Sequence, residues 1–198
     1  MAISLATGNK KHSQAERGAA DLYETPPQAV DALRRVEPLP ACVWEPAAGP
    51  GSIVRSLRTA GHKVIATDLY DWGCPDSLAG ADFLKQDRLP AGVEAIVTNP
   101  PYKLAAPFVR HALRLCPKVI MLMRLAFLES VGRSDILDGG RLARVHLFAN
   151  RLPMMHRDGW QGNKASSAMP FAWFCWDRDH DGPIILRRIK WEAETAGG

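Results

Sequence analysis

The chain has 198 residues, of which 46% are hydrophobic and 23% charged, a composition typical of a globular domain with a full hydrophobic core. Its formal net charge of +4 is compatible with a nucleic-acid partner but does not require one. No apolar run approaches the roughly 20 residues of a membrane span, and the first 18 residues lack the apolar segment of a signal peptide. We therefore expect neither a membrane protein nor a secreted one.

The four cysteines, Cys42, Cys74, Cys116 and Cys175, form no C-x-x-C pair and have no histidine cluster beside them. The spacing typical of a zinc site is missing, and we predict no metal site. Cys42 and Cys175 lie in apolar runs and are predicted to be buried thiols. This usage is typical of a protein in the reducing cytoplasm, where we expect this one.

At the start of the chain, residues 1–20 are polar and carry basic side chains between Lys10 and Arg17. They show no helix or strand period and predict a flexible basic arm, with phosphate contact as the alternative interpretation. A single domain is expected over residues 21–198. Its first helix is predicted to begin after Thr25, a candidate cap, because prolines suit a first helical turn.

Beyond this point, short apolar strands alternate with amphipathic helices, which predicts an α/β domain with a mostly parallel sheet. The last two strands have no helix between them, which predicts an antiparallel edge, and residues 154–170 are predicted to form a long polar loop. Helices are expected at 26–36, 51–60, 104–115 and 125–137, and strands at 41–44, 62–67, 81–84 (brief), 93–98, 118–123, 141–149, 171–176 and 184–191.

A glycine-containing loop follows the first of these strands and opens a helix. Gly49 and Gly51 allow a sharp turn and the close approach of a ligand, and the helix presents its N-terminal N–H groups there. The third glycine of a dinucleotide loop is missing, and no G-K-[ST] follows. The carboxylate of Glu45 would repel a pyrophosphate and suits an ammonium group, so S-adenosylmethionine is favoured over NAD. A plain glycine turn is the alternative.

Two further carboxylates are candidates for contact with a nucleoside. Asp68, followed by Leu69, ends the second strand at the spacing expected for an acidic residue on a ribose diol. Asp82 could accept from an adenine amino group while Phe83 packs on the ring. Each aspartate could instead cap a turn.

These stretches resemble, in order, the motifs of S-adenosylmethionine-dependent N6-adenine DNA methyltransferases, of the small type found in phages and prophages. The resemblance covers roughly residues 20–177 and implies the Rossmann-like class I methyltransferase fold, with a mostly parallel seven-stranded sheet, an antiparallel edge and helices on both faces. It is carried by Tyr23-Glu24-Thr25-Pro26-Pro27, Glu45-Pro46-Ala47-Ala48-Gly49-Pro50-Gly51, Asp68, Asp82-Phe83 and Asn99-Pro100-Pro101-Tyr102.

The resemblance also implies a role for each motif. The methionine part of the cofactor would lie on Glu45 and the loop after it, and its carboxylate end under Thr25. The ribose would lie at Asp68 and the adenine at Asp82 and Phe83. The full set of implied cofactor residues is Tyr23, Thr25, Glu45, Pro46, Ala47, Gly49, Gly51, Asp68, Leu69, Asp82, Phe83 and Asn99.

The Asn99–Tyr102 element would hold the substrate amino group. An exocyclic amine is a poor nucleophile, and acceptors aimed at its hydrogens increase its reactivity. The side-chain oxygen of Asn99 and the carbonyl of Pro100 are the candidate acceptors. Pro100 and Pro101 stiffen the loop, and Tyr102 would stack on a flipped base. Direct in-line attack on the methyl group then needs no covalent enzyme intermediate.

The acceptor stays open at this point. The same element occurs in RNA-base and protein-glutamine methyltransferases, so DNA is expected, with RNA or protein as alternatives. A non-catalytic nucleic-acid-binding module is a second alternative. We expect no separate target-recognition domain. Basic and aromatic residues within 151–168 are candidate nucleic-acid contacts instead, with a solvated loop as the alternative; they include Arg151, Arg157, Trp160 and Lys164.

Overall fold

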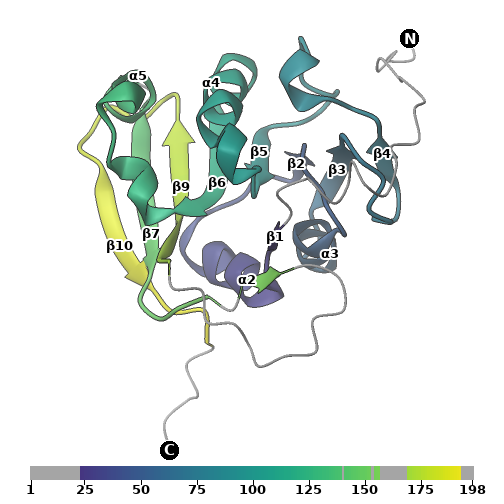
Figure 1. Cartoon of the computed structure of the whole chain (residues 1–198), viewed down its shortest axis with the longest axis horizontal. Helices are drawn as coiled ribbons and strands as arrows, with labels where there is room; N and C mark the ends of the chain where they lie inside the picture. Colours follow the sequence, from purple (N-terminus) through teal and green to yellow (C-terminus); the bar gives the residue numbers. More distant parts are fainter. Residues whose placement is uncertain (1–22, 140, 153, 157–168, 193–198) are drawn as a thin grey trace, which may run out of the picture.

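The computed structural model describes residues 23–139, 141–152, 154–156 and 169–192. In this part of the chain, eight strands form one sheet, in the order β10-β7-β9-β6-β5-β2-β3-β4 (Figure 1). Their bounds are β2 Cys42–Glu45, β3 Lys63–Asp68, β4 Ser77–Ala79, β5 Ala95–Thr98, β6 Lys118–Arg124, β7 Leu142–Phe148, β9 Phe171–Asp177 and β10 Ile185–Ile189. The sheet therefore has one strand more than the seven that the family resemblance implies.

Neighbouring strands of this sheet run parallel except at β9. That strand pairs antiparallel with both β6 and β7, whereas the strands from β4 to β6 pair in parallel. The antiparallel character predicted for this end of the sheet is confirmed in β9. The outermost strand, β10, pairs parallel with β7. The central strands β2 and β5 are buried along their whole length, as expected for a sheet covered on both faces.

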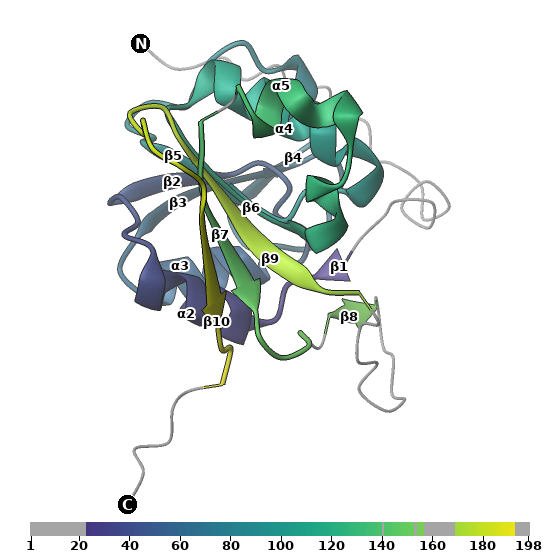
Figure 2. The same cartoon turned by 90° about the vertical axis from the view of Figure 1, so that its left-hand side faces the viewer.

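Helices cover both faces of the sheet, as predicted (Figure 2). On one face, α2 (Pro27–Val36) and α3 (Ser52–Thr59) pack their apolar sides against a core that includes Val43, Val97 and Trp173. On the other face, α4 (Ala105–Leu115) and α5 (Ser134–Leu137) cover a second core that includes Ile96 and Trp176. In this arrangement the loops after β2, β3 and β5 share one edge of the sheet.

Two of the predicted elements are wrong. Residues 81–84 do not form a strand: β4 lies just before them, and a 3₁₀ turn, η1 (Phe83–Lys85), begins where Asp82 Oδ1 accepts from the backbone N–H of Leu84 at 3.1 Å. Residues 125–137 are not one helix. They form two 3₁₀ turns, η3 (Leu125–Leu128) and η4 (Val131–Arg133), before α5, because the backbone at Ser130 is extended.

A small second sheet brings distant parts of the chain together. The strand β1 (Tyr23–Glu24) pairs antiparallel with β8 (Met155–His156), which lies in the segment predicted to be loop. Thr25 does not cap the next helix: Pro26 is its N-cap residue, and no side chain caps it there. Among the described residues no helix is long and apolar enough to cross a bilayer.

Candidate cofactor and substrate cleft

A cavity of ≈ 380 Å³ lies where the carboxyl ends of β2, β3 and β5 meet. This volume suits a small-molecule ligand, and this edge of an open α/β sheet is where ligands bind. The predicted residues that line it are Tyr23, Thr25, Glu45, Pro46, Ala47, Gly49, Asp68, Leu69, Asp82, Phe83, Asn99, Pro100, Pro101 and Tyr102. Gly51 is the predicted cofactor residue that does not line it. The fold thus brings together side chains that are far apart in the sequence.

The glycine loop after β2 has the sharp turns that its sequence predicts. Gly49 and Gly51 both have positive φ angles, of 53° and 92°. Gly51 is the N-cap residue of α3, and a Cβ atom placed on it would lie 2.5 Å from the Sγ atom of Cys74. Gly51 therefore sets the conformation of the loop where it packs against Cys74, while Gly49 in the same loop lines the cavity.

Asp68 ties this loop to the segment after β3. Its Oδ2 accepts from the backbone N–H of Gly49 at 2.9 Å, and its Oδ1 accepts from the backbone N–H of Tyr70 at 2.8 Å and from Trp72 Nε1 at 3.2 Å. Burial raises the pKa of Asp68, against the opposing effect of these hydrogen bonds. The carboxylate holds the cavity wall in shape, and its contact with a ribose stays a prediction.

Glu45, at the end of β2, has an almost fully buried carboxylate. The residue is 1% exposed, and its Oε1 accepts from Oγ1 of Thr98 at 2.7 Å. Its Oε2 has no hydrogen-bond partner among the described residues. Burial raises the pKa of Glu45 well above its usual range, and the bond from Thr98 offsets this only in part. Such a carboxylate favours a cationic ligand group beside it, because a nearby positive charge stabilises its ionised form.

Asn99 is fixed by the strand that precedes α2. Its Nδ2 donates to the backbone carbonyl of Tyr23 at 2.9 Å and to Oγ1 of Thr25 at 3.1 Å. Its Oδ1 is buried and accepts no hydrogen bond from the described residues. Leaving such an acceptor unpaired costs free energy, which the N–H of a ligand would recover. This oxygen is the acceptor that the sequence predicts for a substrate amino group.

Tyr102 is already in contact with other side chains. Its ring stacks on that of Tyr23, with centroids 4.5 Å apart and an angle of 28° between the planes. The guanidinium carbon of Arg124 lies 4.3 Å from its centroid, and the Phe171 ring lies 5.9 Å away. A substrate base that stacks on Tyr102, as predicted, would have to share or replace one of these contacts.

Asp82 and Phe83 lie on the wall of the cavity but have structural contacts of their own. Asp82 caps η1, as its alternative interpretation stated, and its Oδ2 lies 3.0 Å from Nζ of Lys85. Phe83 is 2% exposed and packs against Trp44 and Phe108. Their contact with a cofactor adenine stays a prediction.

Two residues that the sequence interpretation missed take part in this site. Thr98 immediately precedes Asn99 and donates a hydrogen bond to the Glu45 carboxylate. Its position next to the Asn-Pro-Pro-Tyr element was the signal in the sequence that could have indicated its role. Ser52, at the start of α3, donates from Oγ to the backbone carbonyl of Thr25. The first bond joins the ends of β5 and β2, and the second joins the start of α3 to the chain just before α2.

The predicted nucleic-acid contacts fall mostly outside the described residues. Arg157, Trp160 and Lys164 lie there, as does the predicted basic arm at 1–20. Arg151 is exposed, and its backbone carbonyl accepts from Nε1 of Trp191 at 3.0 Å. Contact of all four residues with nucleic acid stays a prediction.

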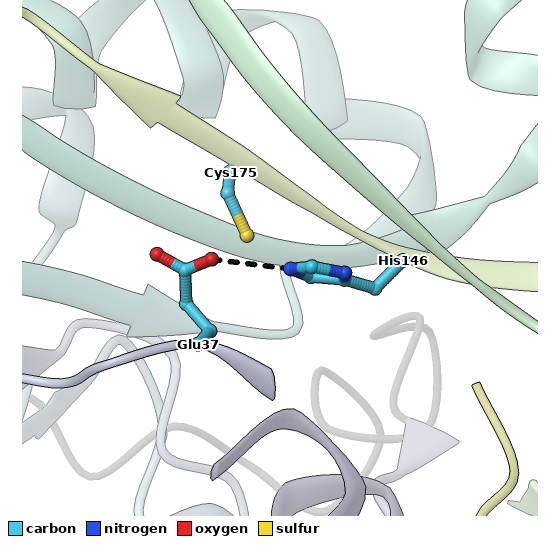
Figure 3. A group of neighbouring side chains, drawn as sticks. All are labelled: Glu37, His146 and Cys175. Carbon is cyan, nitrogen blue, oxygen red and sulfur yellow. Dashed lines mark hydrogen bonds and ion pairs between the residues drawn. The ribbon is translucent and has the colours of Figure 1, made fainter. Parts of the chain in front are cut away.

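A different group, Glu37, His146 and Cys175, has its potential metal-ligand atoms within 4.8 Å of one another (Figure 3). The Glu37 carboxylate accepts from His146 Nε2 at 3.1 Å and from Arg144 at 2.7 and 2.9 Å, and it lies 3.1 Å from Nζ of Lys118. Burial raises the pKa of Glu37, but these hydrogen bonds outweigh it and bring the pKa down to about 2. A metal ion would meet two cations here, so we interpret the group as an ion-pair network that attaches the end of α2 to the sheet.

Comparisons with known proteins reveal the fold. No family model matches the chain, and no curated protein matches it. Solved structures do. A protein assigned as an RNA methyltransferase, PH1948 from Pyrococcus horikoshii, has a TM-score of 0.60 and 13% identity, and the match covers 80% of this chain and 87% of that one.

Two other solved structures have a similar fold. A modification subunit assigned to a type I restriction enzyme of Vibrio vulnificus YJ016 has a TM-score of 0.59 and 14% identity, over 88% of this chain and 48% of that one. A protein of Listeria monocytogenes assigned as a class I S-adenosylmethionine-dependent methyltransferase has a TM-score of 0.54 and 11% identity, over 81% and 62%. The chain has the Rossmann-like fold of class I methyltransferases.

Proposed function

We propose that this protein transfers a methyl group from S-adenosylmethionine to the N6 amino group of an adenine in DNA. The observation that carries the proposal is the pair of buried, unpartnered acceptor atoms at adjacent strand ends. These are Oε2 of Glu45 and Oδ1 of Asn99, linked through Thr98 and both on residues that line one cavity. One suits a cationic ligand group, and the other suits an N–H donor.

The cofactor part of the proposal rests on the loops after β2 and β3. Glu45 would face the ammonium group of the methionine part, and the backbone from Pro46 to Gly49 would follow its chain. Asp68 and Leu69 would reach the ribose, and Asp82 and Phe83 the adenine. The similar structures include a protein assigned as S-adenosylmethionine-dependent, which agrees with this choice. When bound, the cofactor supplies an activated methyl group on a sulfonium sulfur.

The protein's part in the reaction is to orient and polarise the acceptor amine. Asn99 Oδ1 and the Pro100 carbonyl would accept hydrogen bonds from the two amino hydrogens. The nitrogen lone pair is then less delocalised into the ring and can attack the methyl carbon in line. A new N–C bond would replace the C–S bond of the cofactor, and the amino group would afterwards lose one proton to solvent. Tyr23 and Thr25 fix the amide of Asn99 in the required orientation.

DNA is proposed as the acceptor because the ordered motifs resemble those of N6-adenine DNA methyltransferases. The fold does not choose between nucleic acids: the similar structures include a protein assigned as an RNA methyltransferase and a modification subunit assigned to a type I restriction enzyme. We further propose one catalytic domain over residues 21–198, with substrate contacts supplied by 151–168.

A transfer experiment with tritiated S-adenosylmethionine tests the proposal. Unmethylated plasmid DNA, total RNA and a protein extract are offered separately, with Asn99→Ala protein as the matched control. We expect label in DNA with the wild-type protein and at least about 10²-fold slower labelling with the variant. Label in RNA or protein alone would refute the DNA acceptor. Binding of the cofactor without transfer to any acceptor would favour the non-catalytic module.

A further inference from the structure

Beside the substrate loop, one arginine has no carboxylate partner among the residues that the structure describes. Arg124 ends β6, the strand next to β5, and its guanidinium lies over the Tyr102 ring. Its Nε is buried and has no hydrogen-bond partner among the described residues, which also provide it with no carboxylate within 4.0 Å.

Arg55, whose partners Glu24 and Pro50 line the cavity, is different. Arg55 donates to the carbonyl of Pro50 at 2.5 Å and lies 3.3 Å from Oε1 of Glu24, so its charge is paired. Lys103, which follows Tyr102, lines the cavity, is exposed and has no ion-pair partner among the described residues. Among the described residues, Arg124 over the Tyr102 ring and Lys103 beside it therefore have no carboxylate partner, whereas Arg55 has one.

We propose that Arg124 binds a backbone phosphate of the substrate nucleic acid, next to the target nucleotide, and so positions the base at the Asn99–Tyr102 loop. The inference rests on the proposed function and adds the group that recognises the substrate as a nucleic acid. A guanidinium that packs with its face on an aromatic ring keeps its N–H donors free in its own plane. Those donors match the paired oxygens of a phosphate.

This contact would also favour nucleic acid over a protein glutamine as the acceptor. A glutamine side chain carries no charge, so a protein substrate gives no reason for an unpaired cation beside the loop that holds the amino group. A phosphate lies next to every target base of DNA or RNA. Phosphate contact is independent of base sequence, so Arg124 would contribute affinity and position but no sequence preference.

The alternative is that Arg124 only supports Tyr102 by packing on it. Arg133 provides a matched control, because its guanidinium carbon lies 4.6 Å from the Phe127 centroid in the same way. The Nε of Arg133 is likewise buried and unpartnered among the described residues, but its Nη2 donates to the carbonyls of Ala126 and Glu129. The ring beneath it, Phe127, does not line the cavity, whereas Tyr102 does. Loss of an arginine–aromatic contact as such can therefore be measured separately from loss of the proposed phosphate contact.

The test compares wild-type protein with Arg124→Gln, Arg124→Lys and Arg133→Gln. Methyl transfer to duplex DNA is measured at several salt concentrations, and S-adenosylmethionine affinity is measured by calorimetry. For Arg124→Gln we expect KM for DNA to rise about 10-fold to 100-fold, as for loss of a charged hydrogen bond. The slope of log KM against log salt should fall by about one. Cofactor affinity should stay within about 3-fold of wild type.

The lysine variant should keep the salt slope and recover most of the KM, because it keeps the charge, and Arg133→Gln should behave as wild type. An unchanged KM and slope in Arg124→Gln would overturn the proposal. So would equal losses of kcat in the Gln and Lys variants with the slope unchanged, because that pattern is expected of packing on Tyr102 alone.

Direct binding keeps this test independent of catalysis. Fluorescence anisotropy with labelled duplex DNA and labelled RNA, in the presence of S-adenosylhomocysteine, gives affinity and salt slope without turnover. If the wild-type protein methylates no nucleic acid, the proposed function fails. A weaker affinity and a smaller slope for Arg124→Gln would still support the phosphate contact, and equal binding by both proteins would refute it. Thermal melting confirms that each variant is folded.

Discussion

Asn99→Ala should separate the chemical step from cofactor binding. The substitution removes the Oδ1 acceptor proposed for the substrate amine and the two hydrogen bonds that Nδ2 donates to Tyr23 and Thr25. Loss of one pre-oriented polar group in an active site typically lowers kcat by about 10²-fold to 10³-fold. Two lost hydrogen bonds, at about 1 kcal/mol each, should lower the free energy of unfolding by about 2 kcal/mol.

The assay is single-turnover methyl transfer at a temperature well below the melting point of the variant, together with calorimetry of S-adenosylmethionine binding. We expect cofactor affinity to change by less than about 3-fold, because the predicted cofactor contacts lie mainly on the loops after β2 and β3. Thr25→Val is the control: it removes one acceptor of Nδ2 but leaves Oδ1 in place, and should lower kcat much less. Equal losses of transfer and of cofactor affinity in Asn99→Ala would refute the reasoning.

Three further predictions concern the buried groups. Glu45→Gln should abolish cofactor binding as measured by calorimetry, and yet the variant should melt no lower than the wild-type protein at pH 7. The pKa of Glu45 is raised in the folded protein, so ionisation of this carboxyl above pH 4.5 destabilises the fold. A clear loss of stability in the variant would contradict this. Glu37→Gln should destabilise the protein by about 3 kcal/mol at pH 7, because folding lowers the pKa of Glu37 from 4.5 to about 2. Denaturant titrations should show that this advantage of the wild-type protein disappears as the pH drops from 4.5 towards 2. Gly51→Ala should lower the free energy of unfolding by about 1–3 kcal/mol because of the positive φ at this position, and by a further amount because the new Cβ would clash with Cys74. A second substitution, Cys74→Ala, should therefore restore part of the melting temperature. Strictly additive effects of the two substitutions would argue against the clash.

Much of the fold could be predicted because its strands and helices alternate in plain local patterns. The strand predicted at 93–98 appears as Ala95–Thr98, and the helix predicted at 104–115 as Ala105–Leu115. The errors in the predicted elements occur where a single side chain or a single backbone angle determines the local secondary structure. The cap at Asp82 replaces a short strand with a turn, and the extended backbone at Ser130 interrupts a helix. Apolar spacing does not report either of these.

The sequence predicted which motifs form the candidate site, but not the contacts between their side chains. The motifs at Glu45, Asp68 and Asn99 each lie where a strand ends, and parallel strands bring such positions to one edge. The pairing of Tyr23 with His156 depends on long-range contacts that no local pattern contains. The same holds for the bond between Thr98 and Glu45 and for the position of Arg124 over Tyr102. Asn99 likewise depends on distant partners, because Tyr23 and Thr25 lie 76 and 74 positions before it.

The central claim is methyl transfer to the adenine amino group of DNA. The most direct measurement incubates the protein with unmethylated DNA and S-adenosylmethionine that carries a deuterated methyl group, digests the DNA to nucleosides and analyses them by mass spectrometry. We predict deuterated N6-methyldeoxyadenosine with the wild-type protein and about 10²-fold less, or lower still, with Asn99→Ala over the same time. A labelled methyl group on another base position, or no labelled nucleoside from a protein that binds the cofactor, would contradict the proposal.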